Sequence, residues 1–284
     1  MAHREHAAKR ASTFLTRAAI FGILSVFAFA ALYPLVFMLF TSLRTSAEYL
    51  DSPLALPSSF TYFENFLAMT YRFNVPRLFL NAIAYIALSS TICLTASIPA
   101  AFALAKLRFP CRRVFFMLMV ASLAIPAITF IIPDYILMAQ LGLVDNPTSV
   151  VLLWSAQGVP STVFLLTSLM RALPSEILEA ASVDGANYYH LMTRVVVPIS
   201  VPGIITVTIF NVTVWWNDLL IPLVFLQSEA RQTVTAGVAT IVGRFTSDYP
   251  LLVTGLLMAS IPPILIYIFL QRYIRRGLII GAVK

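Results

Sequence analysis

Six long windows of this sequence contain no Asp, Glu, Lys or Arg. They are 20 to 28 residues long, and no other charge-free window exceeds 12 residues. A helix needs about 20 apolar residues to cross the roughly 30 Å hydrocarbon core of a bilayer. Because lipid offers the backbone no hydrogen-bond partners, each crossing segment must close its own bonds as a helix. We therefore predict an all-α, polytopic membrane protein with six transmembrane helices, at residues 18–43, 81–105, 114–133, 149–170, 202–225 and 251–271.

Composition supports this class and excludes others. Hydrophobic residues make up 60% of the 284 residues and charged residues only 11%, whereas soluble domains have about 45–50% and about 25%. An ordinary soluble enzyme is excluded, and the continuously apolar windows do not show the alternation of a transmembrane barrel. We expect one membrane domain at residues 18–271, between tails at 1–17 and 272–284. Several prolines fall inside the predicted spans and are expected to kink them: Pro99, Pro126, Pro160, Pro222 and the pair Pro262-Pro263.

The basic residues indicate which side of the membrane each loop occupies. Six spans place both ends on one side, and that side carries 14 of the 19 Lys and Arg residues. Seven of the twelve acids fall on the other side. The positive-inside rule therefore predicts that both termini are cytoplasmic. The basic residues are dispersed over four segments, so we expect contact with membrane lipid and no nucleic-acid partner.

The two cysteines lie at different predicted depths, Cys93 inside the second span and Cys111 in a cytoplasmic loop. They are therefore expected to be free thiols, and no metal site is expected.

The longest predicted cytoplasmic loop, residues 171–198, contains a short, partly apolar helix. Ser175 is expected to cap its start, Glu176 suits the positive helix end, and Gly185 is a natural stop. A helix of this kind buries its apolar face either on a partner protein or on lipid headgroups. The composition leaves both possibilities open.

In this loop the sequence resembles a known family. Glu179-Ala180-Ala181, two residues, Asp184-Gly185-Ala186, eleven residues and Pro198 match the cytoplasmic EAA loop of the transmembrane permeases of binding-protein-dependent ABC importers. Two further stretches resemble the carbohydrate-uptake branch, and in particular its maltose-type second permease subunit. They are Trp216-Asn217-Asp218 with the following Pro222-Leu223-Val224-Phe225, and the ending from Gln271 to Lys284.

The resemblance implies the type I (MetI-like) ABC-importer permease fold, in the cytoplasmic (inner) membrane of a prokaryote. It implies import of a carbohydrate or related polyol, with three kinds of partner: a second related permease subunit, a dimer of cytoplasmic ATPase subunits and an extracytoplasmic substrate-binding protein. ATP and Mg²⁺ would be bound by the ATPases, so this chain is expected to be no enzyme and to hold no cofactor. The sequence agrees, because it has no phosphate-binding G-x-x-x-x-G-K-[ST] motif. The implied ATPase-coupling residues are Glu179, Ala180, Ala181, Asp184, Gly185 and Ala186.

The end of the fifth predicted span offers candidates for the substrate pathway. Asp218 is an acid well inside an apolar stretch, where a charge costs about 2.5–3.5 kcal/mol on insertion scales. It should therefore face water, another subunit or an interface. Aromatic and amide side chains beside it could hold a sugar by stacking and hydrogen bonding; the candidates are Asn211, Trp215, Trp216, Asn217 and Asp218. Alternatively, Trp215 and Trp216 are interfacial belt residues, and Gln157 and Asn81 are weaker polar candidates that more often join helices.

Other functions fit the sequence less well. An ABC permease for another solute, such as glycerol phosphate, shares these motifs. An ion-coupled secondary carrier would want paired intramembrane acids, and only Asp218 is available. An intramembrane hydrolase would need a Ser/His pair or paired aspartates within the spans, and neither is found.

Overall fold

The computed structural model describes the backbone of residues 2–244 and 248–282, and the side chains of residues 16–240, 248–269 and 271. Regular structure in these residues is helical throughout. The chain forms two compact units, Met1–Phe73 with Phe245–Met258, and Asn74–Arg244 with Ala259–Lys284. Most side chains of the predicted tails, and those of the motif from Arg272 to Lys284, lie outside the described residues.

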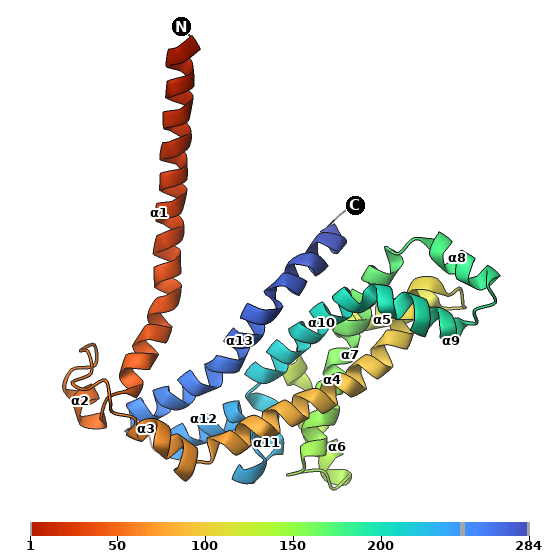
Figure 1. The fold of residues 1–284 in the computed structure, drawn as a ribbon. Helices are drawn as coiled ribbons and strands as arrows, with labels where there is room; N and C mark the ends of the chain where they lie inside the picture. Colours follow the sequence, from red (N-terminus) through yellow and green to blue (C-terminus); the bar gives the residue numbers. More distant parts are fainter. Residues whose placement is uncertain (1, 245–247, 283–284) are drawn as a thin grey trace. The chain divides into compact units, whose positions relative to one another are not determined.

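The first unit is built around a long apolar helix and the loop that follows it. Its elements are α1 (Ala2–Ser42), α2 (Ser46–Asp51), α3 (Glu64–Leu67), the π-helical turn η1 (Ala68–Arg72) and the first part of α13 (Tyr249–Ala282) (Figure 1).

A buried arginine organises this loop. Arg44 donates hydrogen bonds to the carbonyl oxygens of Glu48, Ser52 and Pro53 at 2.5, 2.6 and 3.0 Å. α2 begins with a capping box, in which the Glu48 amide donates to Thr45 Oγ1 and the Thr45 amide donates to Glu48 Oε2. The loop after α1 is therefore held in place by hydrogen bonds between side chains and the backbone.

The second unit contains the remaining helices. They are α4 (Val75–Lys106), α5 (Arg112–Ser122), η2 (Ala127–Phe130), α6 (Ile131–Gln140), α7 (Pro147–Arg171), α8 (Ser175–Val183), α9 (Tyr188–His190), η3 (Leu191–Val196), α10 (Val197–Asn217), α11 (Leu220–Phe225), η4 (Glu229–Arg231), α12 (Val234–Arg244) and the rest of α13. In Figure 1, α8 lies at one end of the long α4, and α11 lies toward the other.

The core of this unit is the contact between α4 and α7. Small residues recur every four positions along the buried face of α4, at Ser89, Cys93, Ser97 and Ala101. Such a stripe lets two helix backbones approach closely, and the polar members can then bond across the interface. Ser89 Oγ donates to the Val151 carbonyl, and Ser155 Oγ of α7 donates to the Ser89 carbonyl, both at 3.3 Å.

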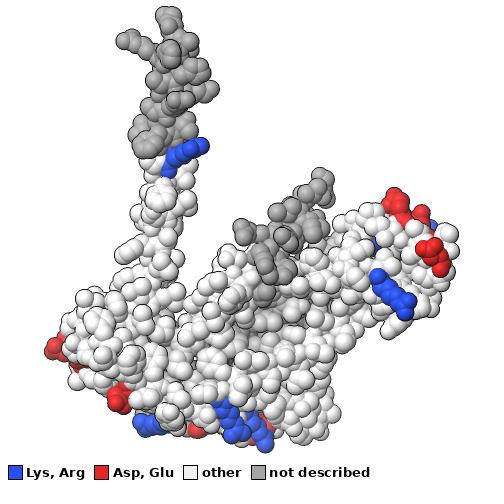
Figure 2. All heavy atoms as spheres, in the orientation of Figure 1, with Lys and Arg blue, Asp and Glu red and all other residues white. Residues whose placement is uncertain are grey.

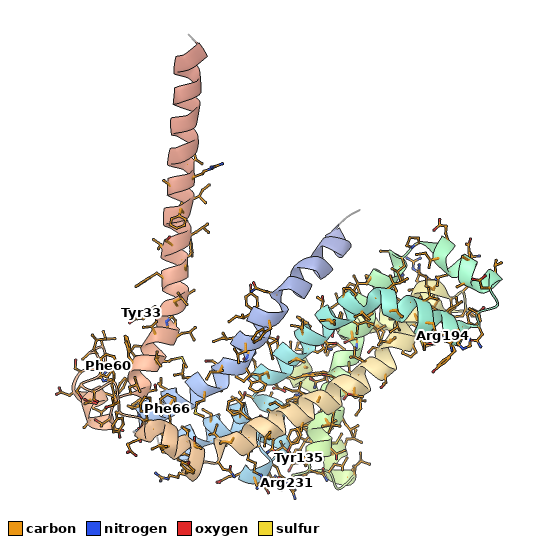
Figure 3. The ribbon with its side chains drawn as sticks, in the orientation of Figure 1. Tyr33, Phe60, Phe66, Tyr135, Arg194 and Arg231 are labelled. Atoms are coloured by element: carbon orange, nitrogen blue, oxygen red, sulfur yellow. The ribbon has the colours of Figure 1, made fainter. Side chains whose placement is uncertain are left out.

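Charged side chains of the second unit gather at its two ends. Figure 2 shows them around α8 and α9 at one end and near α11 and η4 at the other, with an uncharged band between. In Figure 3 the labelled Arg194 lies at the first end, and Tyr135 and Arg231 lie at the second. This separation is typical of a body that crosses a bilayer.

Among the described residues, five helices are long and apolar enough to span a membrane, and a sixth span is counted if one bent pair is taken as a single crossing. The five are Thr16–Ser42, Val75–Lys106, Pro147–Arg171, Tyr188–Asn217 and Tyr249–Phe269. The bent pair is Arg112–Ser122 with Ala127–Gln140, which meet at 91°. The predicted all-α membrane fold is therefore confirmed, with the third predicted span broken.

Three details of the sequence interpretation were wrong. The fifth span runs through Tyr188–Asn217, not 202–225, because the helix continues out of the cytoplasmic loop through η3 and ends before Asp218. Pro222 therefore lies in the separate helix α11. Ser175 does not cap α8: the cap position is Pro174, which has no capping side chain.

The prolines also behave unequally. Pro126 stands at the break between α5 and α6, where it precedes η2. Pro99, Pro160 and the pair Pro262-Pro263 instead lie inside uninterrupted helices.

Candidate functional site

A cavity of about 390 Å³ lies within the second unit, where two interrupted helices meet α7. Its volume falls within the range of small-molecule sites, about 300–1,000 Å³. It is lined by Ala127, Ile128, Ile131, Trp154, Gln157, Gly158, Ser161, Phe210, Asn211, Val214, Trp215, Asp218, Leu220 and Ile221.

The first interruption is the sharp bend between α5 and α6. Residues 123–126 leave the α-helix there, and Ala127, Ile128 and Ile131 just beyond the bend line the cavity. Non-helical backbone at membrane depth is tolerated only where protein or a water-filled cavity covers it. The bend therefore marks this side of the unit as facing something other than lipid.

The second interruption follows α10 and is held by Asp218. One carboxylate oxygen accepts the Trp154 Nε1 hydrogen at 2.7 Å, and the other accepts from the Leu220 amide at 2.9 Å. Asp218 thus ties the end of α10 to α7 and supplies a partner to the first turn of α11. Discontinuous helices around a polar site near mid-membrane are typical of transporters.

Two tryptophans form one wall of the cavity. The rings of Trp154 and Trp215 stack with centroids 6.1 Å apart and an interplanar angle of 10°. Gly158 lies beneath them, and a Cβ there would meet Trp215 Cζ2 at 2.8 Å and Cys93 Sγ at 3.1 Å. The glycine is therefore needed for α7 and α10 to approach this closely.

Polar groups of the cavity differ in whether the protein already uses them. Asn211 Nδ2 donates to Thr162 Oγ1 at 2.9 Å, so this buried amide also joins α10 to α7. Ser161 Oγ donates to the Gly158 carbonyl at 3.1 Å. No side-chain hydrogen bond of Gln157 to a described residue is found, so its amide is available to an occupant.

The structure brings together three of the five residues proposed for the pathway. Asn211, Trp215 and Asp218 line the cavity, whereas Trp216 and Asn217 do not. Trp216 is buried and donates to the Ala259 carbonyl at 3.0 Å, and Asn217 is exposed and donates to the Thr213 carbonyl at 2.7 Å. The alternative of a lipid-facing belt does not fit Trp215 and Trp216, which are only 4% and 5% exposed.

Sequence reasoning missed Trp154, Gly158 and Ser161, and it gave Gln157 little weight. All four lie on α7 at helical spacing, which places them on one helix face. Reasoning also treated Asp218 as the sole acid deep in an apolar stretch, yet Asp134 lies inside α6, within the bent pair. Asn81 is a helix-joining residue, since it donates to the carbonyls of Ala230 and Gln232 at 3.0 Å.

The EAA loop forms a second candidate site at one end of the unit. Glu179, Ala180, Asp184 and Gly185 are exposed, whereas Ala181 and Ala186 are half-buried against the helix ends. Gly185 has φ +85°, a left-handed conformation that favours glycine, and it ends α8 as predicted. Apolar side chains nearby are exposed, notably Val183 at 88%.

A third cluster joins two loops at the opposite end. Asp145 accepts hydrogen bonds from the amides of Gln227 and Ser228 at 3.0 and 2.8 Å, and it forms an ion pair with Arg231 at 3.1 Å. Its carboxylate also accepts the Ser228 hydroxyl, and these bonds to Ser228, with Arg231, hold the pKa of Asp145 below its usual value. The loop after α6 is thereby fixed to the loop after α11.

Among the described residues, no group of three or more His, Cys, Asp or Glu side chains is placed to hold a metal ion. Within the same residues Cys93 is buried and Cys111 exposed, and both are free.

Comparison with known proteins identifies the family to which this chain belongs. Residues 94–280 match the family described as "Binding-protein-dependent transport system inner membrane component". The chain belongs to this family. It is a multi-pass inner-membrane permease, the transport subunit of a binding-protein-dependent system. A putative ABC transporter permease of Caldicellulosiruptor sp. is 33% identical over 265 residues, which cover 93% of this chain and 96% of the relative.

Other permeases of the family are similar over most of their length. An arabinooligosaccharide transport permease of Halalkalibacterium halodurans is 32% identical, covering 90% of this chain and 92% of the relative. A diacetylchitobiose uptake permease of Streptomyces coelicolor is 28% identical, covering 89% and 84%. A crystal structure of a bacterial ABC transporter involved in alginate import contains a chain with TM-score 0.76 and 24% identity, over 90% of this chain and 96% of that one. That likeness shows the fold.

Proposed function

We propose that this permease imports a neutral carbohydrate or polyol through the cavity, as one of two related permease subunits driven by a pair of cytoplasmic ATPases. The cavity at the meeting of two interrupted helices carries the proposal. It is lined by the aromatic side chains of Trp154 and Trp215, and it offers a free amide at Gln157 for a hydroxyl group. Relatives named for oligosaccharide uptake support the same substrate class.

The charge of the cavity favours a neutral solute over a phosphate ester. Asp218 is the one ionisable side chain among the residues that line it, and both of its oxygens already accept hydrogen bonds. A phosphate ester would meet this carboxylate without a basic side chain in the lining to balance it. Glycerol phosphate is therefore the weaker of the two substrate classes.

The partners are proposed from the EAA loop and the opposite end of the unit. The exposed Glu179 and Asp184, with the apolar Val183 and Tyr188, present a surface that a cytoplasmic ATPase could cover. An extracytoplasmic binding protein would then dock at the end that carries Asp145 and Arg231. The excess of basic residues in the tails supports the proposal that both termini are cytoplasmic.

Purification and transport test the proposal together. The chain, isolated from its native membrane in mild detergent, is expected to retain an ATPase subunit and a second permease. A preparation that transports but contains no ATPase would refute the ABC mechanism, and uptake that follows an ion gradient after ATP depletion would favour a secondary carrier.

Substitution of Gln157 by Leu tests the cavity. We expect this variant to raise the KM for neutral sugar uptake by roughly tenfold, as for one lost hydrogen bond, with an unchanged ATPase content. Gln271→Leu is the matched control and should leave uptake unchanged, because Gln271 lies outside the cavity and its amide donates to the Ile268 carbonyl of its own helix. Equal uptake by the Gln157 variant and the native chain would remove the cavity from the pathway.

A further inference from the structure

Lys106, the last residue of α4, contacts the entry to the EAA loop. Its Nζ donates a hydrogen bond of 2.6 Å to the carbonyl oxygen of Leu173, which lies between α7 and α8. The two residues are 67 positions apart in the chain. This is a charge-assisted bond, which is the stronger class of hydrogen bond. It joins α4 to a segment that does not directly follow α4 in the sequence.

A second cation makes the reverse contact. Arg171, the last residue of α7, directs Nη2 toward the Leu104 carbonyl of α4 at 3.5 Å, and its guanidinium lies 4.5 Å from the centroid of the Phe116 ring. The ends of α4 and α7 are therefore cross-linked in both directions. Cations are favoured at these positions, because both helices present the negative end of their dipole there. The carboxylate of Glu176, in the first turn of α8, adds an attraction to the Lys106 ammonium.

Packing reinforces the polar link. The buried cluster at this end contains Ala101, Phe102 and Ala105 of α4 with Leu166 and Met170 of α7. Leu173 packs against this cluster, as do Leu178 and Ala181 of α8. The inner face of α8 thus packs against a cluster built from α4, α7, η3 and α10, while its outer face is exposed.

We infer that Lys106 is a positioning residue that carries movement of the EAA loop into α4. The inference rests on the proposed coupling role of that loop. α8 is joined covalently to α7 and, through α9 and η3, to α10, so a pull on α8 reaches those two helices through the chain itself. α4 can follow only through contacts. Among these, the Lys106 bond reaches the segment that leads into α8, whereas the longer Arg171 contact joins α4 to α7 itself. α4 in turn is the packing partner of α7 along the core of the unit.

Spin labels report this transmission directly, with Mg-ATP as the probe. In the assembled complex carrying Cys111→Ala, one label is placed at position 182 on α8 and, in a separate preparation, one at position 88 on α4. Both native side chains are exposed, and Ser182 is not among the residues assigned to the ATPase surface. With Lys106 present, Mg-ATP is expected to change the spectra of both labels. In Lys106→Met the α8 response should persist while the α4 response falls by roughly threefold to tenfold, the range for one lost contact in a coupled network.

Controls separate this role from folding and from the proposed function. Lys106→Arg keeps a charged donor and should restore the α4 response, and Arg108→Met removes a nearby exposed cation and should change neither label. An α4 response that is unchanged in Lys106→Met overturns the inference. If Lys106→Met does not accumulate in the membrane, Lys106→Gln is measured instead. If neither variant accumulates but Lys106→Arg does, Lys106 has a folding role only, and the inference is overturned. Absence of any α8 response in the native complex would refute the coupling role of the loop itself.

Discussion

Asp218 shows how a residue that looks exceptional in the sequence can be satisfied locally. Its carboxylate oxygens accept from the Trp154 indole and from the Leu220 amide, so the charge is balanced by fixed dipoles. The same bonds define where α10 stops and where α11 begins. Replacing this carboxylate would therefore alter the cavity wall as well as its charge.

A substitution at Gly158 tests how closely the helices pack at the same cavity wall. Gly158→Ala should lower the free energy of unfolding by about 1–3 kcal/mol, because the new Cβ would overlap the buried, stacked ring of Trp215. Gly22→Ala is the matched control: no atom lies within 4 Å of its Cβ position, and the better helix propensity of alanine should leave stability unchanged or slightly higher. Thermal unfolding of the purified complex measures both. A Gly158→Ala variant as stable as the native chain would show that α7 and α10 do not pack this closely at Gly158.

Sequence reasoning located Asp218 and Trp215 because a charge and an aromatic pair stand out against an apolar background. It could not locate Trp154 or Gly158, because tryptophan and glycine are both common in membrane helices and neither stands out in the window at 149–170. Which face of α7 meets the cavity is decided by its contact with α4 and by the bend after Ser122, and neither is encoded in hydropathy.

Helix boundaries were predicted where charges flank the apolar windows and missed where the chain breaks inside one. The spans at Val75–Lys106 and Pro147–Arg171 end on basic residues that the sequence shows directly. The start of the fifth span was placed too late, because Arg194 interrupts the apolar pattern without interrupting the helix. The spacing of charges indicates which residues face lipid. It does not indicate where a helix ends, because a helix can extend beyond the membrane.

The turn that ends α8 provides a test of the EAA loop. Gly185→Val should strain a backbone with φ +85° by about 1–2 kcal/mol and displace α8 from its seat, so ATP hydrolysis should continue while uptake falls. Gly142→Val is matched to it, because Gly142 has φ +67° and equally open space, in the turn after α6. Uptake and ATPase activity are measured in proteoliposomes. An equal loss of uptake in both variants would indicate general strain rather than uncoupling.

The link between Asp145 and the loop after α11 should depend on pH. Because the folded pKa lies below the ordinary value of 3.8, the stabilisation is complete above that value and is lost as the pH falls through the lower, folded pKa. Hydrogen exchange of the amides at residues 227–231, corrected for intrinsic rates, should be constant from about pH 5 to 8. Asp145→Asn should speed this exchange several-fold at pH 7, whereas Asp248→Asn, at the start of α13, should not. Unchanged exchange in Asp145→Asn would show that the ion pair does not order this loop.

Across the whole chain, the orientation in the membrane stays a prediction from the positive-inside rule. The second unit has charged groups at both ends, and the EAA loop occupies one of them. Cys111 lies in the loop between α4 and α5, near that same end, and is exposed, whereas Cys93 is buried.

These two native cysteines make the orientation measurable. A membrane-impermeant maleimide should label Cys111 in inside-out vesicles and not in intact, outer-membrane-permeabilised cells, because the loop is expected to be cytoplasmic. Cys111→Ala should abolish the label, and Ala230→Cys in that background should restore it from the opposite side. Labelling of Cys111 from outside would invert the proposed topology.

The bend between α5 and α6 has a consequence for how such a chain persists in a cell. All residues from 121 to 130 are exposed in the isolated chain, including those outside regular helix. The amides of residues 123–125 are bonded within the turn, but their carbonyls accept no backbone hydrogen bond from the described residues. Hydrocarbon cannot bond these carbonyls, so a companion polypeptide or water must lie against them. If the chain is synthesised without its partner subunits, this surface stays exposed to lipid. Quality-control proteases are then expected to degrade the chain, so its abundance would follow that of the partner subunits.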